Sequence, residues 1–222
     1  PLATVSRGFR WGFQMHKSTI AAFALAAFAT PASAAVVYSN NFDAENGGNT
    51  ALNYNSFNGL TVTDGTVDLV KSGDYGIICA GGAGTCVDPY GSTNNAGLTS
   101  SNSYAFNAGE RVSLTFLFSG NQRQLPADFA LIYFQFGGVA TGTWGYNSTA
   151  YGNGNLGSFN TTELGLGLPN VQPGLAMTDF EFFFLASSAG TVSFTFEDQG
   201  NDNVGVIIDN VALSIGAVPE PS

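Results

Sequence analysis

The sequence predicts an all-β fold with a single antiparallel β-sandwich, and three observations lead to that prediction. Charged residues make up 10% of the 222-residue chain, whereas about a quarter is usual in soluble domains. Helix surfaces depend on Glu, Lys and Arg, so a helical bundle is disfavoured. The chain instead carries 19 Phe, 8 Tyr and 29 Gly, and its apolar residues recur at every second position, as they do in half-buried strands.

Three segments show this alternation most clearly: residues 111–118, 179–184 and 191–197. Residues 129–136 are almost continuously apolar, which predicts a central strand covered on both faces. Further strands are expected at residues 36–42, 60–63, 67–70, 98–100, 104–106 and 204–215. Many short strands separated by polar, Gly-rich turns are typical of a β-sandwich.

The connections predict one domain over residues 35–216. Residues 187–190 and 198–203 are expected to be hairpin loops between consecutive strands. Residues 137–174 are rich in Gly, Asn and Thr and are long for a connection in a compact domain. They are therefore interpreted as either a binding loop or an elaborated hairpin.

The N-terminal part resembles a secretory signal peptide. Residues 15–34 contain Lys17, an apolar stretch too short for a membrane anchor, and the small-residue cleavage site Ala32-Ser33-Ala34. A buried Ala-rich helix is the alternative. Residues 1–14 are expected to be an upstream extension, and cleavage would remove three of the six basic residues.

The C-terminal residues 217–222 contain Val218-Pro219-Glu220-Pro221 directly after a predicted strand. This resembles the start of the PEP-CTERM sorting signal of Gram-negative bacteria, here truncated before its hydrophobic helix and Arg-rich end. The resemblance implies recognition by an exosortase and placement at the cell surface, in the outer envelope or in the extracellular matrix. A simple linker is the alternative.

A second resemblance covers nearly all of residues 40–215. Its motifs, in chain order, are 41–43, 64–69, 88–93, 120–123 and 202–213. The order is similar to that of an exported PEP-CTERM domain related to galactose-binding-domain-like jelly rolls. It implies a β-sandwich of jelly-roll type.

That resemblance also implies one structural calcium ion where the first and last strands meet. The ligands would be Asp43 and Asp209, with Glu45 as a further candidate. Ca²⁺ requires six to eight oxygen ligands, which carboxylates and carbonyls supply. The alternative is that Asp209 and Asn210 bond backbone groups at a bulge, without a metal.

Cys79 and Cys86 are the two cysteines of the chain. In an exported protein they are expected to form a disulfide. A catalytic thiol is disfavoured because the one histidine, His16, lies in the predicted signal peptide.

Two further candidates concern ligand binding. Arg123 is expected either to pair with a carboxylate such as Asp88 or to contact a ligand. An aromatic segment, residues 144–153, contains Trp144, Tyr146, Asn147 and Tyr151. Its rings would stack on sugar rings while its amides bond hydroxyl groups, unless the rings only anchor a long loop to the sandwich.

The sequence thus predicts an exported, non-catalytic surface or extracellular-matrix protein associated with exopolysaccharide, with glycan binding as its activity. The alternative is a structural, self-assembling surface protein with no soluble ligand. Six basic against sixteen acidic residues disfavour nucleic-acid binding. An enzyme is disfavoured because no His-based acid–base machinery remains, although paired carboxylates can cleave glycosides.

Overall fold

A computed structural model describes most of the chain after the predicted signal peptide. The described residues are 34–93, 96–123, 128–172, 174–198 and 205–218. All of them belong to one compact unit, Pro31–Ser222. The signal helix, the upstream extension, most of the 198–203 loop and the Pro-Glu-Pro tail lie outside them. No helix within the described ranges has the length and apolarity to cross a membrane.

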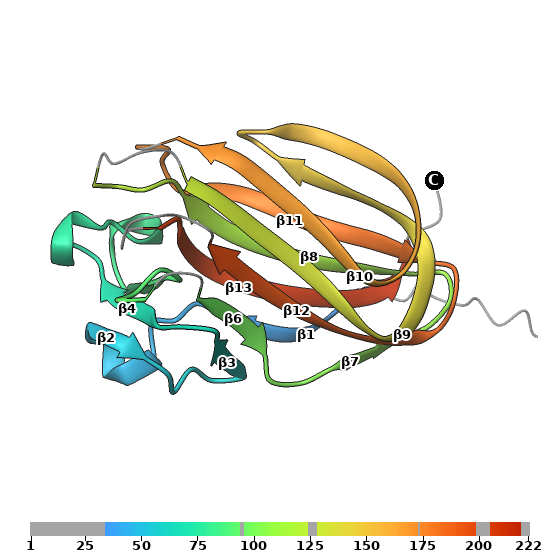
Figure 1. The fold of residues 1–222 in the computed structure, drawn as a ribbon, viewed down its shortest axis with the longest axis horizontal. Coiled ribbons are helices and arrows are strands. Elements are labelled where there is room, and N and C mark those ends of the chain that lie inside the picture. The colour runs from blue at the N-terminus through green and yellow to red at the C-terminus, as the bar shows by residue number, and fades with distance from the viewer. Residues whose placement is uncertain (1–33, 94–95, 124–127, 173, 199–204, 219–222) are drawn as a thin grey trace, which may run out of the picture. The chain divides into compact units, whose positions relative to one another are not determined.

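Thirteen strands are present among the described residues, and every pairing between them is antiparallel (Figure 1). The strands are β1 Ala35–Asn40, β2 Ala51–Tyr54, β3 Leu60–Thr63, β4 Val67–Lys71, β5 Thr85–Asp88, β6 Gly97–Ser100, β7 Tyr104–Phe106, β8 Glu110–Ser119, β9 Asp128–Ser148, β10 Gly152–Val171, β11 Thr178–Ala186, β12 Gly190–Asp198 and β13 Ile207–Ala217. Three single-turn 3₁₀ segments complete the elements, at Glu45–Gly48, Asp74–Gly76 and Ala80–Gly82.

The long strand β9 divides the sheet into two layers. Residues 130–136 of β9 pair with β12, whereas residues 142–148 pair with β11. β10 follows β9 along both halves, with a register shift between Thr161 and Glu163, and Figure 1 shows the two strands bending together. The first layer therefore contains β1, β13, β8, β11 and the second half of β9. The second contains β3, β6, β7, β12 and the first half of β9, and the predicted β-sandwich is confirmed.

The bent hairpin corrects three details of the predicted organisation. Residues 137–174 are largely the β9–β10 hairpin, so of the two alternatives predicted for them the elaborated hairpin is confirmed and the binding loop is wrong. Residues 187–190 do not close a hairpin, because β11 and β12 pair in different layers. Residues 129–136 are not covered on both faces. Their side chains alternate between buried and half-buried, because β9 and β12 leave one face of the second layer open.

The core lies between the layers and consists largely of aromatic rings. Phe182 of the first layer stacks on Phe134 of the second, with ring centroids 4.7 Å apart. Phe116 also contacts Phe196 across the core, but this pair meets edge to face, with ring centroids 4.9 Å apart. All four rings are at most 4% exposed. Burial of one such side chain contributes about 1.5–3 kcal/mol, so these rings hold the two layers together.

Candidate functional site

The outer face of the first layer carries a polar site whose position follows from the alternation in β11. Phe180, Phe182 and Phe184 are at most 1% exposed and point into the core. Because successive side chains of a strand point to opposite faces, Asp179 and Glu181 face outward. Register places Glu181 beside β8 on one side and beside β9 on the other.

Glu181 is the centre of a hydrogen-bond network on this face. Arg111 of β8 donates from Nη2 to Oε1 over 2.8 Å, and Ser113 donates its hydroxyl to the same oxygen. Asn147 of β9 donates from Nδ2 to Oε2 over 2.5 Å. The Arg111 guanidinium also lies over the Phe183 ring, 3.5 Å from its centroid. The carboxylate is therefore held from both neighbouring strands.

These contacts determine the ionisation of Glu181. Burial alone would raise its pKa, but the hydrogen bonds from Ser113, Arg111 and Asn147 and the charge of Arg111 outweigh that effect. The pKa lies below its usual value. Glu181 is therefore ionised at neutral pH and accepts hydrogen bonds there.

A groove of about 570 Å³ lies beside Glu181 on the same face. Thr149 donates its hydroxyl to Asp179 at one end of the groove. Asn210 lies where the register of β13 shifts, between Asp209 and Ala212, and has the left-handed φ of 51°. The groove is lined by Thr115, Phe116, Leu117, Asn147, Asp179, Phe180, Glu181 and Asn210. It combines carboxylates, amides and a hydroxyl with the apolar side chain of Leu117.

Of the predicted ligand-binding residues, Asn147 is the one that lines this groove. The aromatic side chains of the same segment instead pack against the core, from β9 and its turn and not from a loop. The ring pairs are Trp144 with Phe182 at 5.7 Å, Tyr146 with Phe180 at 5.6 Å and Tyr151 with Phe118 at 5.8 Å. These three rings therefore support the sheet under the groove, which corrects the loop placement predicted for them.

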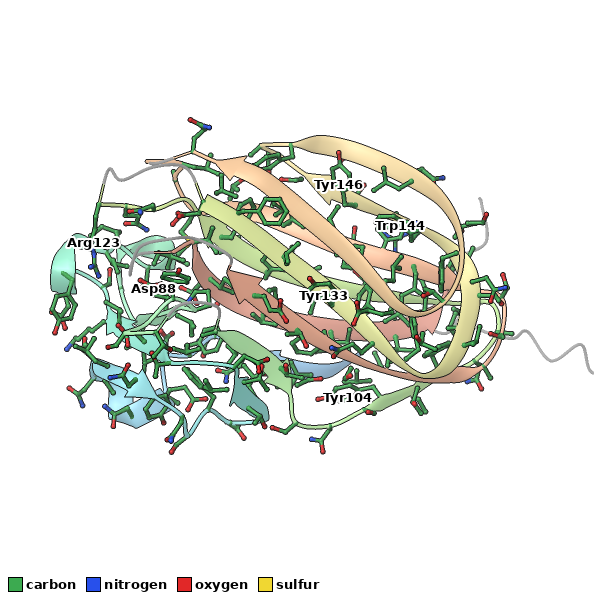
Figure 2. The ribbon with its side chains drawn as sticks, viewed as in Figure 1. Asp88, Tyr104, Arg123, Tyr133, Trp144 and Tyr146 are labelled. Carbon is green, nitrogen blue, oxygen red and sulfur yellow. A yellow bond between two sulfur atoms is a disulfide. The ribbon has the colours of Figure 1, made fainter. Side chains whose placement is uncertain are left out.

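Arg123 lies away from the groove, beyond the end of β8. Its guanidinium carbon is 5.7 Å from the centroid of the Tyr75 ring, and its charge opposes the rise in the pKa of Asp68 that burial causes. The one ion pair among the described residues joins Arg111 to Glu181, so the expected pairing of Arg123 with Asp88 is not formed. Figure 2 shows Arg123 and Asp88 at the left of the view, apart from Tyr146 and Trp144 nearer its centre.

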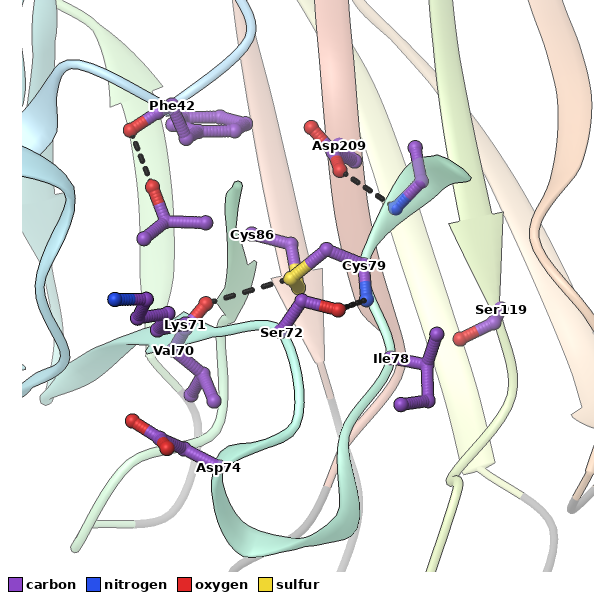
Figure 3. Close-up of a disulfide and its surroundings, with 12 residues drawn as sticks. Phe42, Val70, Lys71, Ser72, Asp74, Ile78, Cys79, Cys86, Ser119 and Asp209 are labelled. Atoms are coloured by element: carbon purple, nitrogen blue, oxygen red, sulfur yellow. Dashed lines mark hydrogen bonds between the residues drawn. A yellow bond between two sulfur atoms is a disulfide. The ribbon is translucent and has the colours of Figure 1, made fainter. Parts of the chain in front are cut away.

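The predicted disulfide between Cys79 and Cys86 is confirmed, with the two Cα atoms 5.4 Å apart (Figure 3). The bond links the loop after β4 to β5. The Ser72 hydroxyl accepts a hydrogen bond of 3.2 Å from the Cys79 N–H. Asp209 lies close to both sulfurs, but bonded sulfurs are not thiolates and this trio is not a metal site.

The carboxylates expected to bind calcium are only partly brought together. Asp209 is 3% exposed and accepts N–H bonds from Ala80 and Asn210, at 3.0 and 2.7 Å. Burial raises its pKa to about 6, and the charge of Asp43 adds to the rise. The Asp43 carboxylate itself accepts hydrogen bonds from the Thr85 N–H at 3.0 Å and from Asn41 Nδ2 at 2.8 Å.

Glu45 does not join that pair. Its Oε1 accepts hydrogen bonds from Asn40 Nδ2 and from the Asn58 N–H, both at 2.8 Å. Its Oε2 accepts from the Tyr54 hydroxyl at 3.3 Å. The Glu45 carboxylate is thus satisfied by a separate network, and the structure does not bring the three acidic groups together.

Sequence reasoning missed the importance of Glu181, Asp179, Arg111 and Asn210. The alternation in residues 111–118 and 179–184 already places Arg111, Asp179 and Glu181 on solvent-facing positions. Their meeting depends on the pairing of β8 with β11, which links positions about 70 residues apart in the chain. No local pattern reports such a contact.

Comparison with known proteins yields similarity at the level of fold alone. No protein-family model matches the chain, and no curated protein matches it in sequence. The carbohydrate-binding module TmCBM61, solved with β-1,4-galactotriose, is similar with a TM-score of 0.41 and 14% identity, over 69% of this chain and 85% of that one.

Two further solved structures show the same kind of similarity. The CBM22-1 xylan-binding domain of Paenibacillus barcinonensis Xyn10C has a TM-score of 0.43 and 10% identity, over 86% of this chain and 100% of that one. The K3 adhesin domain of Lys-gingipain from Porphyromonas gingivalis has a TM-score of 0.37 and 13% identity, over 82% of this chain and 99% of that one.

Proposed function

We propose that this chain is an exported, non-catalytic surface or extracellular-matrix protein that binds a neutral exopolysaccharide chain in the groove of the first layer. The observation that carries the proposal is the fixed network around Glu181. Its polar groups project from paired strands and are held by one another, so they need little ordering when a ligand binds.

The chemistry of the groove suits a sugar chain. Glu181 and Asp179 accept hydrogen bonds from hydroxyl groups, while amides such as Asn210 both donate and accept them. Leu117 offers an apolar surface for the C–H face of a sugar ring. The two carboxylates disfavour uronic acids and sulfated sugars, which leaves neutral glycans as the class that fits.

The ionisation of Glu181 supports binding over catalysis. A carboxylic acid that protonates a glycosidic oxygen at neutral pH needs a raised pKa. The pKa of Glu181 is lowered instead, and the residue is engaged by three donors. Asp179 and Glu181 are therefore proposed to recognise hydroxyl groups and not to act as an acid–base pair.

The groove is tested by affinity electrophoresis in a panel of neutral polysaccharides, with calorimetry on the oligosaccharide that binds. Asn147→Ala and Glu181→Gln should each weaken binding about tenfold. Each variant loses one hydrogen bond between the glycan and an amide or a charged group, and such a loss has about this effect on affinity. Glu110→Gln, a conservative change outside the groove, is the matched control. Binding by both groove variants at the wild-type level would refute the proposed function.

Export and sorting to the envelope of a Gram-negative bacterium remain part of this proposal. They rest on the signal-peptide pattern of residues 15–34 and on the Pro-Glu-Pro motif. Expression in such a host, with mass spectrometry of the mature N-terminus, tests the first. Sorting is tested in an exosortase-deficient strain. In that strain the protein should fail to reach its surface location.

We also propose that Asp43 and Asp209 share one calcium ion. Support comes from the burial of Asp209 and from its coupling to Asp43. Calcium would offset the negative charges of these two carboxylates, neither of which forms an ion pair among the described residues. It would link β13 to the segment after β1, so its role would be structural.

A self-assembling structural protein is the second candidate, and the edge strand β10 favours it. Among the described residues β10 pairs with β9 alone, and its 20 residues include one charged side chain, Glu163. A long edge with few charges can pair with another chain. Size-exclusion chromatography with light scattering tests this, since assembly through β10 predicts concentration-dependent oligomers that a Leu156→Lys substitution, at an exposed position of β10, disrupts.

A further inference from the structure

The outer face of the second layer carries a different surface, here called the tyrosine face and centred on Tyr133. Strand register places five outward residues in one row across the layer. The row runs from Gly165 on β10 through Tyr133 on β9, Thr195 on β12 and Thr99 on β6 to Thr61 on β3. The Tyr133 ring thus lies in one row with three threonines on a rigid sheet, and the threonine next to it, Thr195, is buried by its neighbours at 2% exposure.

Glycines on the neighbouring strand leave the rings of this face uncovered. A Cβ atom added at Gly165 would lie 2.9 Å from the Tyr133 ring, and one at Gly167 would lie 2.9 Å from the Phe129 ring. The rings therefore lie over the bare backbone of β10. Tyr133 and Phe129 are both half-buried, so each ring has one side on the sheet and the other toward solvent, as a stacking ligand requires.

The hydroxyl groups beside Tyr133 are oriented by one another. Thr195 donates to Gln135 Oε1 over 3.0 Å and contacts the Thr99 hydroxyl at 2.9 Å. Because Thr195 donates to Gln135, it accepts from Thr99. Within the part of the chain that the structure describes, no hydrogen bond uses the Gln135 amide NH₂, which leaves a donor for a ligand next to the ring.

The charges around Tyr133 are all negative. Burial raises the pKa of Tyr133, and the charges of Glu197 and Glu163 raise it further. The Glu197 side chain lies beside a third glycine, Gly97. A Cβ atom added at Gly97 would lie 3.5 Å from Glu197 Cγ. The five strands of this face contain no Lys or Arg. Anionic sugars are therefore repelled, and an ammonium group beside the ring would meet both carboxylates and the π-face.

We propose that the tyrosine face is a second, independent binding site, which takes a polysaccharide whose sugars carry free amino groups. The sugar ring stacks on Tyr133, its hydroxyls bond the Thr99 hydroxyl and the Gln135 amide, which the buried Thr195 orients, and its ammonium group lies between Glu163 and Glu197. This goes beyond the proposed function, because the groove lies on the other layer and suits neutral sugars.

The test compares two oligomers that differ in one group, a β-linked glucosamine hexamer and its N-acetylated form. Calorimetry on the full chain should show the glucosamine hexamer binding about tenfold tighter, with the difference shrinking as salt rises. Tyr133→Ala should lose about tenfold in affinity for the glucosamine hexamer, whereas Tyr133→Phe, which keeps the ring, should retain most of it. Circular dichroism confirms that both variants are folded.

Matched controls separate this site from general attraction to an acidic protein. Glu197→Gln should weaken binding of the glucosamine hexamer several-fold, whereas Glu110→Gln, which removes the same charge from β8, should not. Glu181→Gln alters only the groove and should leave the affinity of the tyrosine face for the glucosamine hexamer unchanged. Loss of binding at the groove and loss of binding at the tyrosine face are therefore distinguished. Equal losses in the Glu197 and Glu110 variants, unaltered binding by Tyr133→Ala, or equal affinity for both hexamers would overturn the proposal.

Discussion

Glu181 in the groove and Asp209 beside the disulfide are two acidic residues that the same sandwich treats in opposite ways. Glu181 has Arg111, Ser113 and Asn147 as donors, and its pKa is lowered. Asp209 is 3% exposed, accepts two backbone N–H groups and lies near a second carboxylate, and its pKa is raised to about 6. Burial favours the neutral acid in both places, so the neighbours decide the outcome.

The comparison shows how the few basic side chains of this acidic protein are distributed. The described residues contain three basic side chains, Lys71, Arg111 and Arg123, and one of them is committed to the groove. The end of the sandwich near the disulfide holds two aspartates without such a partner. The groove carboxylate Glu181 thus has a cationic partner within the chain, whereas the charge of Asp43 adds to the burial that raises the pKa of Asp209.

The largest expected effect is the pH dependence at Asp209. A raised pKa means that the folded chain holds this proton more tightly than the unfolded chain does. With calcium chelated, the free energy of unfolding should therefore fall as pH rises from about 4 to about 6, by about 3 kcal/mol, and then level off. Urea titrations across this range should show the slope in the wild type and in Glu110→Gln. A slope that persists in Asp209→Asn would contradict the assignment.

Calcium should act most strongly where Asp209 is ionised. At 100 times its dissociation constant, the ion is expected to raise the free energy of unfolding by about 2.7 kcal/mol. Scanning calorimetry at pH 7 with EGTA, calcium or magnesium measures the shift. Asp43→Asn should remove most of it and Glu45→Gln should not, since Glu45 belongs to another network. No shift in the wild type would show that the pair binds no calcium.

The disulfide should rank next, because it holds the loop that donates to Asp209. Replacing both cysteines by Ala opens the short loop between residues 79 and 86, and the chain-entropy model gives a loss of about 2.5 kcal/mol. Equilibrium denaturation of the double variant measures it. Glycan binding in the groove should survive at temperatures where the variant is folded. Loss of binding without unfolding would mean that the two regions are coupled.

The smallest effect is expected from Arg111→Met, which leaves Glu181 without its cation. The Arg111–Glu181 pair is partly exposed, so the loss should be about 1 kcal/mol at neutral pH. Because the pKa of Glu181 is lowered by its partners, this loss should vanish as pH falls and the carboxylate becomes protonated. Arg123→Met is the control, since Arg123 makes no ion pair among the described residues. A loss that is the same at acid and neutral pH would point to packing on Phe183.

Much of the fold could be predicted because period-two patterns are local. The alternation in residues 179–184 and 191–197 predicts β11 and β12, and the two cysteines of a chain expected to be exported predict the disulfide. The layer to which each strand belongs could not be predicted in this way. β11 and β12 follow one another in the chain but pair in different layers, because the bent β9 lies between them in the sheet.

The candidate site shows the same division between local and distant information. Asn147 was identified from its own segment, whereas Glu181 acquires its importance from Arg111 and Ser113 on another strand. Trp144 and Tyr146 were misplaced in a loop although they alternate with Gly145 and Asn147. Gly-rich composition masked the strand pattern there, and the packing of both rings on the core follows from that strand.

The position of β13 has a consequence for folding. β13 lies between β1 and β8 and is the last of the described strands in chain order. Its pairing with β1 joins residues 35–40 to residues 211–215. Contacts between strands so distant in sequence form slowly. The first layer is therefore expected to close late in folding, after the local β9–β10 hairpin has formed.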